Sequence, residues 1–137
     1  MRNNLMLSTV LTLLLGATPI QAQAPAPTTI KRNELLKADM PKFGPMEGYS
    51  IEVEIAPGGE SGWHYHPGHE FTYPLSGEAT AIYDGKPSVI LKPVMAHHFE
   101  PGVAHNVKNT STTTPYKAIV VYIVEKGKPV SIPTSAK

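Results

Sequence analysis

Three of the chain's six histidines and one glutamate lie within ten residues, in the stretch SGWHYHPGHE at 61–70. His64 and His66 are two residues apart, so both imidazoles point to one face if the segment is a strand. Glu70 follows a Pro-Gly-His turn, and a returning strand can bring its carboxylate opposite the two imidazoles. Two histidines and a carboxylate on one face are the ligand set of non-haem iron-type metal sites. A fourth ligand has to come from histidines further along the chain, which are His97, His98 and His105.

The other histidines have different expected positions. His69 precedes Glu70 and is expected to point away from it, towards the surface or a supporting position. His97 and His98 are adjacent, so they cannot both face the interior. The residue that does would act as a proton shuttle or bind a ligand, and we take His98 as the candidate catalytic residue. The alternative is that both are ordinary strand residues, one of them solvated.

The composition narrows the chemistry further. The chain has 137 residues and no cysteine, which excludes thiolate metal sites, iron–sulfur clusters and thiol chemistry. Its 12 basic and 11 acidic residues give a net charge of +1 and are scattered along the sequence. Nucleic acid and anionic membranes require a basic patch, so we expect a small-molecule ligand and no nucleic-acid partner.

The first residues have the pattern of an export signal. Residues 1–24 contain Arg2, an apolar run over 5–15 and small residues at Ala22 and Ala24. This order is typical of a secretory signal peptide, and the apolar run is shorter than the roughly 20 residues of a membrane span. We therefore expect a periplasmic or secreted protein with no membrane attachment after cleavage.

The rest of the chain has the pattern of an all-β protein. The stretch YSIEVEI at 49–55 alternates apolar and polar residues strictly, as a half-buried strand does. Further β-rich runs follow, separated by turns among the 14 prolines and 11 glycines of the chain. Pro74 interrupts one run and should lie at an edge or a bulge. The uncharged run 118–124 should be paired on both sides or covered by another subunit.

We expect a single domain, since a chain of this length rarely forms two cores. Strand alternation places Thr72 on the inner face with Glu70, and Phe71 and Tyr73 on the outer face. The expected parts are a signal peptide at 1–24, a linker with a short strand or turn at 25–45, a barrel at 46–130 and a C-terminal tail at 131–137.

Two segments of the chain resemble the two motifs of the cupin superfamily. The first motif is carried by Gly58, His64, Tyr65, His66, Glu70 and Gly77. The second is carried by Gly102, His105 and Asn109 in the stretch VMAHHFEPGVAHNVKN at 94–109. This second segment departs from the family pattern at Val94, where the family has a glycine, and at Glu100, where it has a proline.

The resemblance implies a double-stranded β-helix, or jelly-roll barrel, that holds a metal. By this resemblance the ligands are His64, His66, Glu70 and His105, and the cofactor is one divalent transition metal: iron, manganese, zinc, nickel or copper. The resemblance also implies a homodimer, which the outward aromatic residues of the strand after Glu70 would support.

The function implied by the resemblance is that of a metal-dependent dioxygenase or oxidase acting on a small oxygen-rich molecule. One alternative is a non-catalytic protein that binds a metal or a small ligand. Another is an isomerase or epimerase that uses the histidines as bases. A titratable group beside the metal would favour an enzyme, because proton transfer requires one.

Overall fold

The computed structural model describes residues 29–135, so the expected signal peptide at 1–24 lies outside the described residues. Strands dominate this part of the chain, and its one helical element is the 3-10 turn η1 (Pro41–Phe43). No helix among the described residues is long and apolar enough to cross a membrane.

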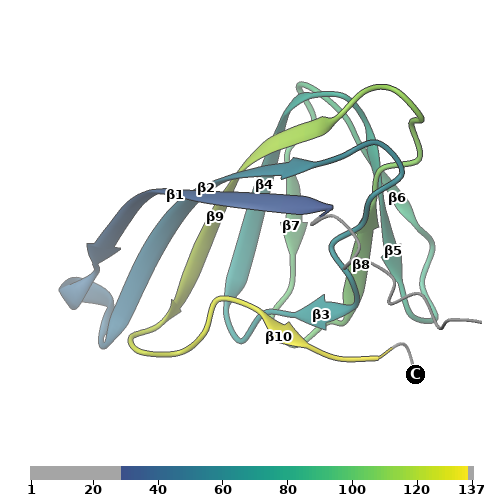
Figure 1. The fold of residues 1–137 in the computed structure, drawn as a ribbon. Coiled ribbons are helices and arrows are strands. Elements are labelled where there is room, and N and C mark those ends of the chain that lie inside the picture. The colour runs from purple at the N-terminus through teal and green to yellow at the C-terminus, as the bar shows by residue number, and fades with distance from the viewer. Residues whose placement is uncertain (1–28, 136–137) are drawn as a thin grey trace, which may run out of the picture.

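Two five-stranded antiparallel sheets face each other and enclose the core (Figure 1). The long sheet has the order β1-β2-β9-β4-β7, and the short sheet has the order β10-β3-β8-β5-β6. The strands of the long sheet are β1 (Ile30–Asp39), β2 (Met46–Ile55), β9 (Tyr116–Glu125), β4 (His69–Ser76) and β7 (His97–Phe99). Those of the short sheet are β10 (Ile132–Pro133), β3 (His64–Tyr65), β8 (His105–Lys108), β5 (Ala79–Tyr83) and β6 (Val89–Leu91). The predicted all-β, jelly-roll class is confirmed.

The alternation in β2 works as the sequence predicts. Ile51, Val53 and Ile55 are buried in the core, while the glutamates between them remain partly exposed. Burying each of these side chains stabilises the fold by about 1.5–3 kcal/mol. Because β2 pairs with β1 on one side and β9 on the other, its buried face lies near the middle of the enclosed core.

Two predictions about strand edges are confirmed. The uncharged run 118–124 lies in β9, which pairs with β2 and with β4 and is therefore no edge. Pro74 lies in β4 beside a register shift towards β9, and the pairing of β4 with β7 ends before it, at Thr72. The missing N–H of Pro74 is tolerated at such a bulge.

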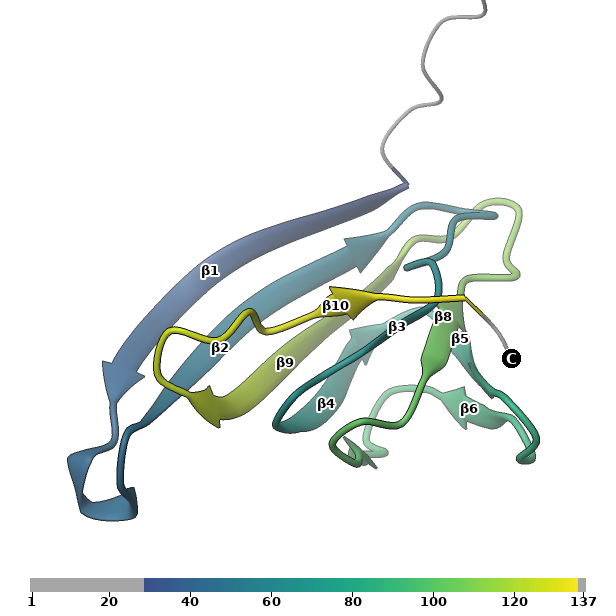
Figure 2. The same ribbon diagram turned by 90° about the horizontal axis from the view of Figure 1, so that it is seen from below.

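The two ends of the described chain contribute more strand than the sequence indicates. β1 runs for ten residues along the edge of the long sheet, where only a short strand or turn is predicted (Figure 2). Ile132 and Pro133, within the predicted C-terminal tail, pair with Tyr65 and His64. Almost all of β1 is exposed, so it lacks the apolar alternation from which a strand is predicted.

Candidate metal centre

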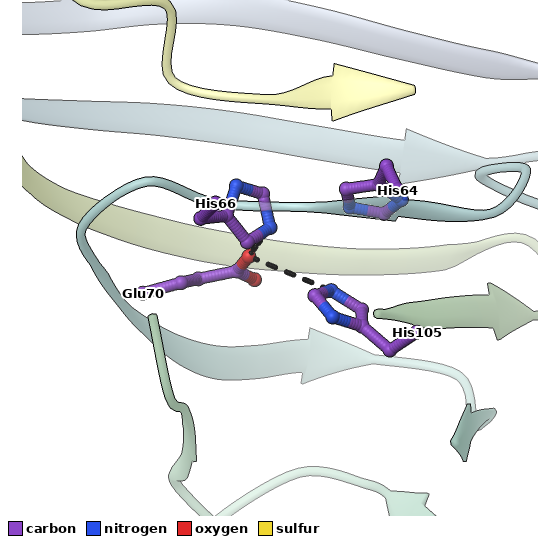
Figure 3. A group of neighbouring side chains, drawn as sticks. All are labelled: His64, His66, Glu70 and His105. Atoms are coloured by element: carbon purple, nitrogen blue, oxygen red, sulfur yellow. Dashed lines mark ion pairs between the residues drawn. The ribbon is translucent and has the colours of Figure 1, made fainter. Parts of the chain in front are cut away.

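Four side chains that the sequence singles out as ligands converge between the two sheets (Figure 3). His64 lies on β3, His66 directly follows β3, Glu70 lies on β4, and His105 is the first residue of β8. All four are buried, and one nitrogen or oxygen of each lies within 4.8 Å of those of the others. Metal–ligand bonds of about 2.1 Å can span such a group. We call these four residues the inner cluster.

Backbone carbonyls fix the orientation of all three inner-cluster imidazoles. The Nδ1 atom of His64 donates to the carbonyl of Gly62 at 2.8 Å, and that of His105 donates to Val103 at 3.0 Å. His66 donates from Nδ1 to the carbonyl of Val130 at 2.5 Å. Because a carbonyl only accepts, each ring carries its proton on Nδ1 and has a free lone pair on Nε2. This tautomer is the one that binds a metal through Nε2.

A hydrogen bond also fixes the orientation of the Glu70 carboxylate. Thr72 donates its hydroxyl to Oε1 of Glu70 at 2.7 Å, which confirms that Thr72 shares the inner face. The other oxygen, Oε2, faces Nε2 of His66 and lies 4.0 Å from Nε2 of His105 (Figure 3). One oxygen is thus engaged by the protein and the other points into the cluster.

The donor set fits a metal ion. Among the described residues, the buried side-chain atoms without a hydrogen-bond partner include Nε2 of His66, Oε2 of Glu70 and Nε2 of His105. Buried polar atoms without partners are costly, so three that meet at one point need a common partner. A cation at this point satisfies all three, and neutral imidazole with carboxylate suits a divalent transition metal.

The pKa values of the inner-cluster residues favour the binding of a cation. Burial lowers the pKa of His105 to about 4 and also lowers the pKa of His64, so both rings are neutral at neutral pH. Burial alone would raise the pKa of Glu70, but the close approach of His66 and the hydrogen bond from Thr72 outweigh it, so the pKa is lowered. His64 and His105 therefore offer neutral nitrogens, and Glu70 offers an ionised oxygen.

A cavity adjoins the inner cluster between the two sheets. His64 and Glu70 line it together with Tyr116 and Tyr122. Arg32 of β1 also lines this cavity. Among the described residues, Arg32 forms no ion pair with a carboxylate. Since β1 is hard to predict from its sequence, Arg32 is a site residue that the sequence does not reveal.

Of the two adjacent histidines of β7, His97 is the one on the inner face. It pairs in register with Thr72, and its Nε2 lies 2.5 Å from the hydroxyl of Tyr83. His98 pairs with Phe71 and stacks on that ring at 4.6 Å, so it lies on the outer face of the long sheet. The prediction that His98 is the one of the two that faces the interior is therefore wrong: His97 faces inward, although it does not line the cavity beside the inner cluster.

The structure does not bring His98 to the inner cluster, because alternate residues of a strand point to opposite faces. His69 also lies on the outer face, as expected, and its Nδ1 is 2.9 Å from Nε2 of His98. The sequence could not reveal Val130, which acts through its backbone carbonyl, or Tyr83, whose pairing with His97 depends on how β5 and β7 are brought together.

A polar anchor lies where the second motif ends. Asn109 is fully buried and donates to the carbonyls of Ile55, Ala56 and Thr114. These bonds tie the end of β8 to the end of β2 and to the loop before β9. The asparagine therefore supports the sheet that presents His105.

The comparisons with known proteins agree with this architecture. A family model described as a cupin domain matches residues 51–122. None of the curated proteins compared matches the sequence.

Three solved structures illustrate the likeness. A cupin-like protein from Thermotoga maritima is 20% identical, with a TM-score of 0.62 over 78% of this chain and 77% of that one. An oxalate oxidase in complex with glycolate is 20% identical, with a TM-score of 0.60 over 79% of this chain and 56% of that one. The DMSP lyase DddQ from Ruegeria pomeroyi is 22% identical, with a TM-score of 0.56 over 66% of this chain and 44% of that one.

At these identities the likeness establishes the fold, which is the double-stranded β-helix expected from the sequence. The chain spans only about half the length of the oxidase and the lyase. Together with the family model, which covers more than half of its residues, the likeness shows that this chain belongs to the cupin family.

Proposed function

We propose that this protein is an exported metal-dependent oxidoreductase, of the dioxygenase or oxidase type, that acts on a small oxygen-rich molecule. The observation that carries the proposal is the convergence of three buried atoms without a hydrogen-bond partner, from His66, Glu70 and His105, beside a cavity. A bound divalent metal would supply Lewis acidity there and, if it is iron, manganese, nickel or copper, reactivity towards dioxygen.

The cavity supports a substrate with an anionic group. Arg32, an exposed residue of β1, brings a positive charge to the wall that also contains His64 and Glu70. A carboxylate or an ionised hydroxyl could pair with Arg32 while other oxygens of the same molecule face the inner cluster. The remaining wall is largely apolar, with Val53, Ile55 and others, which favours a small molecule over a sugar chain.

A pair of titratable residues on the far side of Phe99 from the inner cluster supports an enzyme. Burial lowers the pKa of His97 and raises the pKa of Tyr83 to about 12, so the phenol keeps its proton and shares a hydrogen bond with Nε2 of His97. The ring of Tyr83 is 6.1 Å from that of His105, centre to centre. Such a pair can hold a proton and return it near the reacting molecule.

The likeness to an oxalate oxidase solved with glycolate also favours oxidoreductase chemistry on a small acid, as fold-level support only. The likeness to a DMSP lyase shows that the same fold serves other reactions. A test of activity must therefore begin with the metal.

One observation favours the alternative of a metal-binding protein without turnover. The ring of Phe99 stacks on His105 at 4.1 Å and contacts His97 at 4.6 Å. It therefore screens His97 from the inner cluster. In this alternative His97 and Tyr83 only stabilise the end of the barrel.

Elemental analysis of the protein, purified without chelator or an affinity metal, tests the proposal first. The matched variant is His64→Ala with His105→Ala, and the control is His97→Ala, which leaves all four inner-cluster residues in place. We expect about one redox-active metal per chain in the wild type and the control, and loss of that ion in the double variant. Oxygen uptake with small hydroxy acids and diols should then be lost in both variants.

The possible results separate the candidates. Equal metal in the double variant and the wild type would overturn the ligand assignment. One metal per chain with no oxygen uptake on any acid or diol would favour the metal-binding alternative. Zinc at this stoichiometry would exclude redox chemistry and leave Lewis-acid chemistry or binding.

Export and dimerisation belong to the same proposal. The signal-peptide pattern at 1–24 supports export, and cell fractionation with N-terminal sequencing tests it.

The exposed aromatic side chains of Phe71 and Tyr73 on the outer face of the long sheet support a homodimer. Light scattering coupled to size-exclusion chromatography distinguishes one copy from two.

A further inference from the structure

A second group of potential metal ligands lies on the outer face of the long sheet. It consists of His69 on β4, His98 on β7 and Glu100 just after β7, whose potential ligand atoms lie within 4.8 Å of one another. We call these three residues the outer cluster. His69 and Glu70 are neighbours on one strand, so the outer cluster and the inner cluster lie on opposite faces of β4.

In the outer cluster, Glu100 contacts His98 and His98 contacts His69, an order of contacts that suits metal binding. A carboxylate oxygen of Glu100 lies 3.4 Å from Nδ1 of His98. Nε2 of His98 in turn lies 2.9 Å from Nδ1 of His69. A carboxylate beside Nδ1 favours the tautomer of His98 with its proton there, so Nε2 presents a lone pair towards His69. Carboxylate, imidazole and metal in this order are a recurrent arrangement that raises the basicity of the ligand.

The spacing of the two nitrogens suits one ion. Two nitrogens bound to one metal at about 2.1 Å are separated by about 3.0 Å at a right angle and by about 3.4 Å at the tetrahedral angle. The 2.9 Å between Nδ1 of His69 and Nε2 of His98 is close to the first value, so a zinc ion would need the two rings to move apart slightly. Binding would require the proton of His69 to move from Nδ1 to Nε2, which faces away, and it leaves the charge of the ring unchanged.

Neighbouring rings hold the two imidazoles in place. His98 stacks on Phe71 with an angle of 11° between the planes, and His69 stacks on His98 with an angle of 25°. Phe71 and His98 are register partners on paired strands, so the stack rests on the sheet itself. Ligands whose rotamers are restricted by packing lose less entropy when they bind a metal.

We propose that the outer cluster is a second metal site, distinct from the inner cluster. His69 and His98 would each supply one nitrogen, Glu100 would orient His98, and water would complete the coordination. Two imidazoles select a borderline transition cation such as Zn²⁺, Ni²⁺ or Cu²⁺ rather than Mg²⁺ or Ca²⁺. The site binds more weakly than the inner cluster, because it offers fewer ligands and is partly open to solvent.

Equilibrium dialysis of the full chain against Zn²⁺, read by atomic emission, tests the proposal. We expect His98→Ala and His69→Ala to bind one ion per chain fewer than the wild type. Tyr73→Ala, which changes an exposed ring on the same face of β4 but no ligand, should bind as many ions as the wild type. Glu100→Gln should bind the same number with an affinity about 10- to 100-fold lower.

The test separates the two clusters from each other. His105→Ala should lose the inner ion and keep the outer one, so failure of the inner cluster leaves the difference between wild type and His98→Ala unchanged. The proposal is overturned if His98→Ala and His69→Ala bind as many ions as the wild type. In that case the two histidines only hydrogen-bond to each other. It is also overturned if Mg²⁺ competes for the outer ion as well as Ni²⁺ does.

Discussion

His64 and His105 are direct register partners in the antiparallel pair of β3 and β8, and their rings lie 4.4 Å apart, centre to centre. Residues that are opposite in an antiparallel pair project to the same face. A slip of one residue would turn one imidazole out of the core. The inner cluster therefore depends on the register of the short sheet as much as on its ligands.

Loss of the hydroxyl of Thr72 should weaken metal binding without removing a ligand. Thr72→Val keeps the volume of the side chain but leaves Oε1 of Glu70 without its 2.7 Å hydrogen bond. Because such supporting bonds orient metal ligands, we expect affinity for the metal to fall by about 10- to 100-fold. Titration with Zn²⁺ against a competing chelator measures this. Thr80→Val, on a strand of the short sheet away from the inner cluster, is the control and should bind normally.

The metal-free protein should lose stability as the pH falls below neutrality. Burial lowers the pKa of His105 to about 4 from 6.5, so the unfolded chain binds the proton more tightly than the folded chain does. The contribution of His105 is therefore complete above pH 6.5 and is lost between pH 6.5 and 4. It amounts to about 3 kcal/mol, and the lowered pKa of His64 adds to it in the same direction.

Urea unfolding of the metal-free protein between pH 7.5 and 4 measures this dependence. His105→Gln removes the titrating group, so its free energy of unfolding should vary less with pH over that range. A pH dependence as steep as that of the wild type would contradict the assignment.

Replacing Val94 with glycine should stabilise the protein. Val94 has φ of 66°, in the left-handed region, and is the only non-glycine residue with positive φ in the described part of the chain. A branched side chain in this conformation costs about 1–2 kcal/mol, which explains why the family motif has glycine there. After the entropy cost of glycine, we expect Val94→Gly to raise the free energy of unfolding by about 1 kcal/mol. Gly102→Ala, at φ of 73°, should have the opposite sign.

Any side chain at Gly68 should disturb the inner cluster. A Cβ at this position would overlap the backbone carbonyl of Ile123, which belongs to the central strand β9 and cannot move aside easily. Gly68 lies in the turn between His66 and Glu70, so relief of the overlap displaces ligands. We expect Gly68→Ala to cost at least about 2 kcal/mol of stability and to lower metal affinity.

Thermal unfolding and metal titration together check this prediction. Gly48→Ala is the matched control, because its Cβ would meet the flexible side chain of Met40 at 3.3 Å. That variant should retain both stability and metal affinity. Equal behaviour of the two variants would contradict the assigned role of the turn.

Arg32 should determine the affinity for anionic ligands. Arg32 lines the cavity beside the inner cluster, whereas Lys31, its neighbour on β1, pairs with Glu54 at 3.5 Å. Arg32→Gln should weaken binding of a small carboxylate such as glycolate at least tenfold and leave the metal content unchanged. Calorimetry of the metal-loaded protein measures the affinity, and Lys31→Gln should bind normally. Equal affinities of the two variants would mean that the ligand does not reach Arg32.

The sequence predicts much of the inner cluster because strand parity acts over short distances. His64, His66 and Glu70 are close in sequence, so alternation and one turn are enough to bring them together. Strand alternation does not predict which of His97 and His98 faces inward. β7 has only three residues, and its pairing with β4 decides which face each side chain takes. The regularly spaced turns predict the fold class. The length of β1 cannot be predicted from sequence, because pairing with β2 determines that length.

Contacts made by backbone groups are also hard to predict from sequence. Val130 supports His66 through a carbonyl that every residue type possesses. Its position depends on β10 pairing with β3, a contact between two residues of each strand. No side-chain pattern encodes such a contact, so the C-terminal segment looks like a tail although it holds a ligand in place.

The inner cluster draws its ligands unevenly from the chain, and this bears on how the protein acquires its metal as it folds. Three ligands lie within seven residues, so ordering one short loop is enough to gather them around an ion. His105 arrives only when β8 pairs with β3. An ion present during folding therefore meets three of the four ligands first, and it is held tightly only when the barrel closes. In a refolding reaction, the moment of tight retention would mark the joining of the two halves of the chain.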